Sequence, residues 1–347
     1  MRIISLMRFL CHLAYVKRQF NKRKKLLVPG RYILMPSMRS FSLDDPGVFE
    51  VAKKYFPQTW HSRVKCFVVS VLNKLGAFTN RKQGGCYQAM YIANKYDKVR
   101  EVKLFSFCEN KILTICTSSV SFEKQLDQYQ RLSFAYSMPP VVPMPDCENS
   151  YEIEMITLLP RGDAISALQE IAEAHMKFFA TKGHFSVEKI LGDMRMRAEY
   201  ADVVRTIKEK LSFGILTVEF PLCMQHGDLS QDNLMYGTCA GEKGYWWIDW
   251  EHEGLRLFYY DFFFYILNSA YCTHDLAPLH TYLRGECDGI LKKWFELAGI
   301  QYCEAKREEY LWVYFLSFLN ERVHTVDTAQ NYLAFLEMEL QAFGAKK

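Results

Sequence analysis

The chain lacks several features that mark common classes of protein. None of its apolar runs reaches the roughly 20 residues that a membrane-spanning helix needs. Its 11 cysteines form no Cys-x-x-Cys pair and no zinc-finger spacing with histidines, which argues against a structural zinc site. The net charge of +4 is too small to indicate nucleic-acid binding. Scattered cysteines without paired spacing favour free thiols in a reducing compartment, so we expect a cytoplasmic protein.

Apolar and aromatic residues, in contrast, are plentiful. Half of the 347 residues are hydrophobic and 15% are aromatic, which is enough for a large core and for two lobes. Basic residues crowd one short stretch, with six of them between Lys17 and Lys25. They follow an apolar helical face that includes Leu6 and Leu10. We expect this leader, residues 1–27, either to contact the inner membrane surface peripherally or to pack on the domain.

The most informative residues lie in two short segments. The first reads HGDLSQDN over residues 226–233, and the second reads IDWE over residues 248–251. Two strand-like runs joined by a turn-rich connection separate them, so a hairpin would bring Asn233 and Asp249 together. Phosphoryl-transfer sites use an Asp to accept the substrate hydroxyl proton, then an Asn and a later Asp on magnesium. This order predicts Asp228 as the base, with Asn233 and Asp249 as magnesium ligands.

The two segments resemble the aminoglycoside phosphotransferase and choline kinase family, which has the protein-kinase-like fold. That family carries His-x-Asp-x-x-x-x-Asn, then Ile-Asp-(Trp/Phe)-Glu, and often a further Asp that begins an aromatic helix. In this chain the further residue is Asp261, within YYDFFFY at 259–265. The resemblance implies that His226 and Asp261 brace the catalytic loop, and that ATP and Mg²⁺ are the cofactors.

The predicted secondary structure agrees with this resemblance. Strand-like runs at 87–92, 102–107 and 112–116 precede a helix at 122–134 and a strand at 151–159. Asp163 is a plausible N-cap for the helix that follows, and the remainder is largely helical. We therefore predict an α+β, protein-kinase-like two-lobe fold, with a small antiparallel-sheet N-lobe and a larger, mainly helical C-lobe.

The predicted domain boundaries follow from these elements. They are a basic amphipathic leader at 1–27, an irregular or helical N-terminal extension at 28–80, a small nucleotide-binding lobe at 81–159, and a helical catalytic lobe at 160–347.

The phosphate-binding elements of the small lobe depart from the family pattern. The candidate glycine turn is Lys82-Gln83-Gly84-Gly85, which is not a GxGxxG. Lys103 is the candidate phosphate-binding lysine, with Glu123 as its partner on the following helix. Lys111, at the start of the next strand, is the alternative.

The sequence thus predicts a phosphotransferase with an alcohol group as acceptor. It would be an ATP- and Mg²⁺-dependent small-molecule kinase acting on a sugar, an amino alcohol or a surface-glycan intermediate. The basic leader and the HGD and DWE segments resemble bacterial phosphotransferases of surface-polysaccharide pathways. Trp250 and Glu251 are the candidate acceptor contacts. The expected partner is a small molecule, not a nucleic acid.

Two alternatives remain open. One is a choline or ethanolamine kinase, in which aromatic residues would form a cage for a quaternary ammonium group. The candidates for this cage are Trp246, Trp247, Trp250, Tyr259 and Trp312. The other is a catalytically inactive kinase-fold binding protein that docks on a membrane through residues 1–27.

Overall fold

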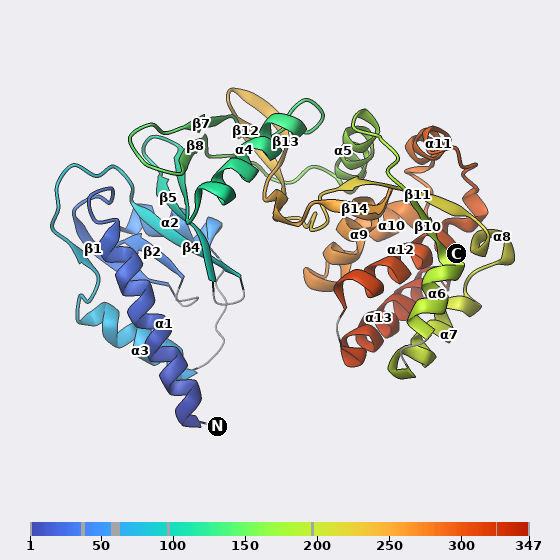
Figure 1. Ribbon diagram of the computed structural model, residues 1–347, viewed down its shortest axis with the longest axis horizontal. Coiled ribbons are helices and arrows are strands. Elements are labelled where there is room, and N and C mark those ends of the chain that lie inside the picture. The colour runs from blue at the N-terminus through green and yellow to red at the C-terminus, as the bar shows by residue number, and fades with distance from the viewer. Residues whose placement is uncertain are drawn as a thin grey trace. The chain divides into compact units, whose positions relative to one another are not determined.

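The computed structural model describes residues 2–35, 39–56, 63–95, 98–195, 198–323 and 325–345. The chain divides into two compact units (Figure 1). The sheet unit comprises residues 1–131 and 139–156, and the helical unit comprises residues 132–138 and 157–347. Among the described residues, no helix is both long enough and apolar enough to cross a membrane.

The sheet unit is built on one eight-stranded antiparallel sheet with the strand order β3-β1-β2-β4-β5-β6-β8-β7. Its strands are β1 (Gly30–Leu34), β2 (Ser40–Leu43), β3 (Thr79–Asn80), β4 (Ala89–Lys95), β5 (Lys98–Ser106), β6 (Lys111–Cys116), β7 (Val141–Pro143) and β8 (Ser150–Glu154). Its helices are α1 (Arg2–Lys22), α2 (Pro46–Tyr55), α3 (Arg63–Lys74) and α4 (Ser119–Leu132).

Helices cover both faces of this sheet. Successive strand residues point to opposite faces, so Leu104 and Phe105 of β5 belong to different cores. Leu104 packs in a cluster with residues of α1 and α3, whereas Phe105 packs in a cluster with Ala52 of α2 and with Phe56, which follows that helix. On the Phe105 face, Gln125 of α4 donates from Nε2 to Glu101 Oε2 at 2.9 Å. The sheet is therefore the middle layer of its unit.

Residues 28–80 contain the helices α2 and α3, as a helical extension would, but they are not separate from the sheet. They contribute β1, β2 and β3 to the same sheet as the strands that were predicted from the sequence. Each of these strands is short, and β2 is paired with the distant strand β4. Such pairing leaves little periodic signal in the sequence, which explains why the prediction missed it.

The C-terminal half of the predicted leader belongs to the core of the sheet unit. Val16 and Phe20 of α1 are buried in the cluster formed with Tyr32 and Phe41, and Leu27 joins them. Lys17, Arg18, Lys22 and Lys25 are exposed. The leader is thus not a separable tail, and membrane contact through its basic side chains stays a proposal.

Deleting residues 1–27 is accordingly expected to destabilise the protein. Full burial of a Val, Leu or Phe side chain contributes about 1.5–3 kcal/mol, and the deletion removes three of them. A melting curve would show a lower Tm. As a control, Lys17→Gln combined with Lys22→Gln should keep the wild-type Tm. Salt-sensitive loss of binding to anionic liposomes in this variant would support membrane contact, and an unchanged Tm on deletion would contradict the core packing.

The helical unit contains helices and two small sheets. Its larger helices are α5 (Ala164–Lys177), α6 (Val187–Arg195), α7 (Ala201–Glu209), α9 (Tyr260–Cys272), α10 (Ala277–Leu283), α11 (Asp288–Leu297), α12 (Arg307–Arg322) and α13 (Val326–Gly344), and α8 (Phe213–Leu216) is short. One three-stranded sheet has the order β10 (His184–Ser186), β11 (Glu219–Gln225) and β14 (Gly254–Leu257). The other has the order β13 (Glu242–Trp247), β12 (Leu234–Cys239) and β9 (Thr157–Leu158).

These elements confirm the predicted α+β fold with an antiparallel-sheet unit and a mainly helical unit. Asp163 is the N-cap of α5 and accepts a hydrogen bond from the Ser166 backbone N–H at 2.9 Å, as predicted. Strands β4, β5 and β6 lie at the predicted positions, and β12 and β13 form the predicted hairpin. The sequence between the first two of these strands, NKYDK at 94–98, suits a hairpin link, and residues 96–97 of it lie outside the described part of the chain.

Candidate active site

The site is built on a loop and a hairpin of the helical unit. Strand β11 ends at Gln225, the loop runs over residues 226–233, and β12 begins at Leu234. Leu234 pairs with Trp247 across the hairpin, and the Ile248 N–H donates to the Asn233 carbonyl at 3.1 Å. Asn233 therefore lies opposite Ile248, directly beside Asp249. The hairpin brings these two residues together, as the sequence predicts.

The carboxylate of Asp261 accepts hydrogen bonds from the backbone at the start of the loop. Asp261 lies in the first turn of α9 and is fully buried. Its Oδ2 accepts from the His226 N–H at 2.6 Å, and its Oδ1 accepts from the Gly227 N–H at 2.8 Å. Burial by itself would raise the pKa of Asp261, but the hydrogen bond from His175 and the loop N–H groups hold that pKa below its usual value. An ionised carboxylate is the form that accepts several N–H donors best.

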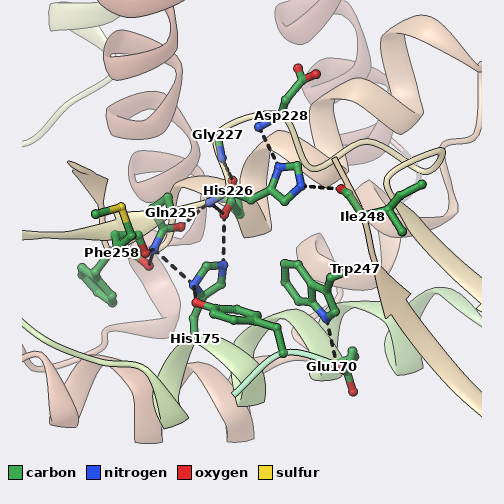
Figure 2. A network of polar contacts seen from close by, with 12 residues as sticks. Glu170, His175, Gln225, His226, Gly227, Asp228, Trp247, Ile248 and Phe258 are labelled. Atoms are coloured by element: carbon green, nitrogen blue, oxygen red, sulfur yellow. Dashed lines mark hydrogen bonds and ion pairs between the residues drawn. The ribbon is translucent and has the colours of Figure 1, made fainter. Parts of the chain in front are cut away.

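His175 and Gln225 form a second layer of buried polar groups (Figure 2), and both contact Asp261. His175 Nε2 lies 3.0 Å from Asp261 Oδ2, and Tyr136 Oη lies 2.9 Å from His175 Nδ1. Gln225 accepts from the Asp261 N–H through Oε1 at 3.0 Å and directs Nε2 toward His175 Nδ1 at 3.4 Å. Because the amide Nε2 of Gln225 is only a donor, His175 Nδ1 acts as an acceptor and Nε2–H donates to Asp261.

The His226 ring links the loop to the end of the hairpin. Its Nδ1 accepts from the Asp228 N–H at 3.3 Å, and its Nε2 lies 2.8 Å from the Ile248 carbonyl. Burial lowers the pKa of His226. A neutral ring protonated at Nε2 satisfies both contacts. His226 thereby joins Asp228 to Ile248, the residue before Asp249, and the bracing of a catalytic loop by His226 stays a proposal.

Asp228 carries its carboxylate away from this buried network, as Figure 2 shows. The side chain is 37% exposed, and its Oδ1 lies 3.3 Å from Nη2 of Arg322. Burial raises the pKa of Asp228, although Arg322 and His252 act to lower it. A carboxylate whose pKa is raised is a better proton acceptor, which suits a general base.

Asn233 and Asp249 offer oxygen atoms suited to magnesium. Asn233 donates from Nδ2 to the Asp228 carbonyl at 2.7 Å, which leaves its amide oxygen for a ligand. Asp249 is exposed and adopts the left-handed conformation, with φ 63° and ψ 57°. Such a conformation is uncommon outside glycine and clusters at functional sites.

Two protein oxygens are few for a metal ion. Among the described residues, no three His, Cys, Asp or Glu side chains converge to hold one. Mg²⁺ commonly takes one or two protein oxygens and fills its octahedron with phosphate oxygens and water. The pair fits a magnesium ion that binds together with a nucleotide.

The aromatic residues proposed for acceptor contact or for a choline cage are core residues instead. Trp250 is 5% exposed, with its ring centroid 4.6 Å from that of Tyr136 and 4.7 Å from that of His226. Trp246, Trp247, Tyr259 and Trp312 are also buried. Trp250 thus packs against the loop, and its burial argues against contact with an acceptor. Glu251, which lies 3.2 Å from the ring of His252, stays a candidate acceptor contact.

In the sheet unit, Lys103 does not pair with Glu123 as proposed. Its Nζ lies 2.9 Å from Oε1 of Glu101 on the same strand, and Glu123 is exposed on α4. Gln125, two residues further along α4, is the helix residue that contacts Glu101. Helical spacing turns Glu123 and Gln125 to different faces, which explains the difference.

The glycine turn has a packing role. A Cβ on Gly85 would lie 2.4 Å from the Leu27 carbonyl oxygen, so only glycine lets these backbones approach. The Cys86 N–H donates to the Leu26 carbonyl at 3.1 Å. Glycine is therefore required in this turn by its close contact with the segment after α1, and that requirement would hold without any bound phosphate.

A cavity of about 480 Å³ adjoins the loop at Gln231. Its wall includes the N-terminus of α5, and Gln231 donates from Nε2 to Asp275 Oδ2 at 2.8 Å. Arg161 also contacts Gln231. Tyr245 and Tyr265 line it, and Tyr245 Oη is buried without a hydrogen-bond partner among the described residues. This cavity offers several polar groups beside the loop that carries Asp228.

Three site residues escaped the sequence prediction. His175 is a buried residue of α5 that also contacts Asp261. Gln225 and Arg322 were not singled out at all. Gln225 directly precedes the motif, and Arg322 is the last residue of α12, 94 positions after Asp228. No local sequence pattern connects such distant positions.

Comparison with solved structures found matches at low sequence identity. A choline/ethanolamine kinase family protein from Mesorhizobium loti is 14% identical with a TM-score of 0.41, over 73% of this chain and 87% of that one. Aminoglycoside 2′-phosphotransferase-IIIa in complex with GDP is 12% identical with a TM-score of 0.41, over 82% and 96%. An ethanolamine kinase from Plasmodium vivax is 14% identical with a TM-score of 0.38, over 85% and 92%.

No protein-family model matches the chain, and the comparison with curated proteins found no match. The solved structures to which the chain is similar include members of the choline/ethanolamine kinase and aminoglycoside phosphotransferase families, at low sequence identity.

Proposed function

We propose that the protein is an ATP- and Mg²⁺-dependent kinase that transfers the γ-phosphate to a hydroxyl of a small molecule. One observation carries this proposal. A single loop and hairpin present Asp228, Asn233 and Asp249 on one support, and the buried Asp261 accepts from two consecutive N–H groups at the start of that loop. This arrangement supplies a base and two metal ligands in the order that phosphoryl transfer uses.

In this proposal the oxygen of the acceptor hydroxyl attacks the γ-phosphate, and Asp228 accepts the proton of that hydroxyl. Its carboxylate is partly exposed and attached to a braced backbone, so it can meet the hydroxyl in a defined direction. Asn233 and Asp249 would hold magnesium, which neutralises charge on the nucleotide phosphates. The ring of His226 links Asp228, which precedes the hairpin, to Ile248, which follows it.

The acceptor would bind in the cavity beside Gln231. Its lining combines tyrosine rings, an unpartnered hydroxyl of Tyr245, and the charged side chains of Arg161 and Asp275. Mixed donors and acceptors of this kind suit a sugar, an amino alcohol or a surface-glycan intermediate better than a quaternary ammonium group. The burial of the tryptophans removes the basis for a choline cage.

A screen for ADP formation over sugars, aminoglycosides and amino alcohols tests this function. We expect turnover that requires Mg²⁺ and at least one acceptor of these classes. An inactive binding protein of the same fold would form no ADP with any acceptor. Absence of Mg²⁺-dependent stabilisation by ATP in a thermal melt would contradict nucleotide binding itself.

Replacing Asp249 by asparagine should weaken the binding of ATP in the presence of Mg²⁺ by roughly 10–100-fold, since an interaction with a charged group contributes about 1.5–3 kcal/mol. Asparagine tolerates the left-handed conformation, so the substitution removes the charge without straining the backbone. Isothermal titration with and without Mg²⁺ measures the change. Asp232→Asn, at an exposed position in the same loop, is the control. Equal affinity in Asp249→Asn and wild type would place the metal elsewhere.

Lys103 is proposed to contact the nucleotide phosphates. It lies in the middle of β5, where the strand sets its direction, whereas Lys111 begins β6 between Glu109 and Glu152 at 3.6 Å from each. Lys103→Ala is therefore expected to raise the KM for ATP more than Lys111→Ala does. Steady-state kinetics at saturating acceptor would check the ranking, and the reverse order would assign the contact to Lys111.

A further inference from the structure

The end of α12 approaches the loop at the candidate base. Arg322 is the last residue of this helix, and its Nη2 donates to the Gly227 carbonyl. The same Nη2 lies 3.3 Å from Asp228 Oδ1. The guanidinium also lies over the ring of Phe264, 5.8 Å from its centroid, and the side chain is only 25% exposed. Arg322 thus touches both the backbone and the carboxylate at the centre of the site.

The helix that carries Arg322 is firmly seated. Residues 310–319 of α12 are buried without interruption. Because a buried helix is a rigid support, the core of the unit fixes the backbone from which the guanidinium reaches the loop. Arg322 can therefore impose a geometry on the loop.

A second contact from the same helix end reinforces the first. Glu321 Oε2 lies 2.7 Å from Nε of Arg256, whose guanidinium packs against Gly227. A Cβ at position 227 would lie 2.4 Å from Arg256 Nη1, and Gly227 has a φ of +79°. The end of α12 therefore contacts Gly227 in two ways, directly through Arg322 and indirectly through the Glu321–Arg256 pair.

Four backbone polar groups of the loop at 226–228 have identified partners. The N–H groups of His226 and Gly227 donate to Asp261, and the Asp228 N–H faces His226 Nδ1. The Gly227 carbonyl is the acceptor that Asp261 and His226 cannot satisfy, and Arg322 satisfies it. One side of the loop is fixed by α9 and the other by α12.

From these contacts we infer that Arg322 is a positioning residue for Asp228, an inference that rests on the proposed kinase function. Its guanidinium binds the Gly227 carbonyl and one carboxylate oxygen, Oδ1. The remaining oxygen, Oδ2, is then directed to the acceptor hydroxyl. A guanidinium suits this role because it presents several N–H donors in a fixed plane, which a lysine cannot do.

Arg322→Gln and Arg322→Lys test the inference, with Arg205→Gln on α7 as the control. Arg205 is 68% exposed and pairs only with the exposed Asp202 among its described neighbours. Displacing a base from its productive geometry can cost about 100-fold in rate. We expect Arg322→Gln to lower kcat by roughly 10–100-fold with the KM for ATP unchanged, and Arg322→Lys to recover part of the loss.

Hydrogen exchange of a peptide that covers residues 226–233 provides a readout that needs no turnover. Loss of the Arg322 contacts should speed exchange there by roughly tenfold or more, while Arg205→Gln exchanges like wild type. Wild-type exchange and wild-type kcat in Arg322→Gln would overturn the inference. A lower Tm with an equally raised KM in both Arg322 variants would mark a purely structural role and would also overturn it.

The kinetic measurement and the hydrogen-exchange measurement together distinguish failure of this inference from failure of the proposed function. If the wild type forms no ADP with any acceptor, the kinase proposal fails, and the exchange experiment still decides whether Arg322 positions the loop. If the wild type turns over but the Arg322 variants match it in rate and exchange, only the positioning role fails.

Discussion

Asp228→Asn is expected to lower kcat by about 10²–10⁴-fold, the usual contribution of a positioned general base. Asparagine keeps the size of the side chain and an oxygen that can face Arg322, so the loop should hold its conformation. The variant should therefore bind ATP with Mg²⁺ as the wild type does, because Asn233 and Asp249 are unchanged. Steady-state kinetics together with calorimetric titration of the nucleotide would measure both properties.

Asp232→Asn is the matched control for this experiment. It removes the same charge from the same loop, four residues further on, at a position whose side chain is exposed. We expect its kinetics to be close to those of the wild type. Near-normal turnover in Asp228→Asn, or an equal loss in both variants, would show that Asp228 is not the base.

Asp261→Asn is expected to produce the largest loss of stability, about 2–4 kcal/mol. The substituted amide has one acceptor oxygen in place of two, so at least one buried loop N–H loses its partner, at about 1–3 kcal/mol per group. The contact with His175 Nε2 is weakened as well, since a neutral amide accepts less strongly than a carboxylate. Urea denaturation would measure the free energy of unfolding, and kcat should fall with it because the loop loses its support.

The depressed pKa of Asp261 adds a pH dependence to the same prediction. A carboxyl with a lower pKa in the folded state contributes stability above its unfolded pKa, and this contribution is lost as the pH falls through the folded value. The difference in stability between wild type and Asp261→Asn should therefore shrink at acidic pH. Asp202→Asn, which changes an exposed aspartate on α7, should be neutral at every pH. A pH-independent difference would show that Asp261 is not the titrating group.

Local features of the site could be predicted from the sequence because their causes lie close together in the chain. The five-residue spacing between Asp228 and Asn233 defines one loop, and the turn-rich connection between β12 and β13 defines the hairpin that carries Asp249 back to it. The capping role of Asp163 likewise depends on a residue three positions away. In each case the interaction is specified within a few residues, so the sequence pattern contains it.

The contacts within the sheet unit, where the nucleotide is proposed to bind, were predicted less well because they depend on residues far apart in the chain. Lys103 was identified as a mid-strand lysine, but its partner proved to be Glu101 and not Glu123. Pairing depends on which face of α4 turns to the sheet, and that is settled by the packing of the whole helix. The strands β1 and β2 were missed because they are short, and each also pairs with a strand far along the chain, β1 with β3 and β2 with β4.

By itself, the sequence determined the order of the candidate base and the candidate metal ligands, and the local structure that presents them. Only the tertiary structure decided which residues support that order and which are excluded from it. Arg322 reaches Asp228 from 94 residues away, and His175 reaches Asp261 from another helix. Trp250 follows Asp249 directly, yet its side chain is buried among Tyr136 and His226. Long-range contacts and burial arise from close packing of the whole unit, in which a residue's neighbours are set by every element around it.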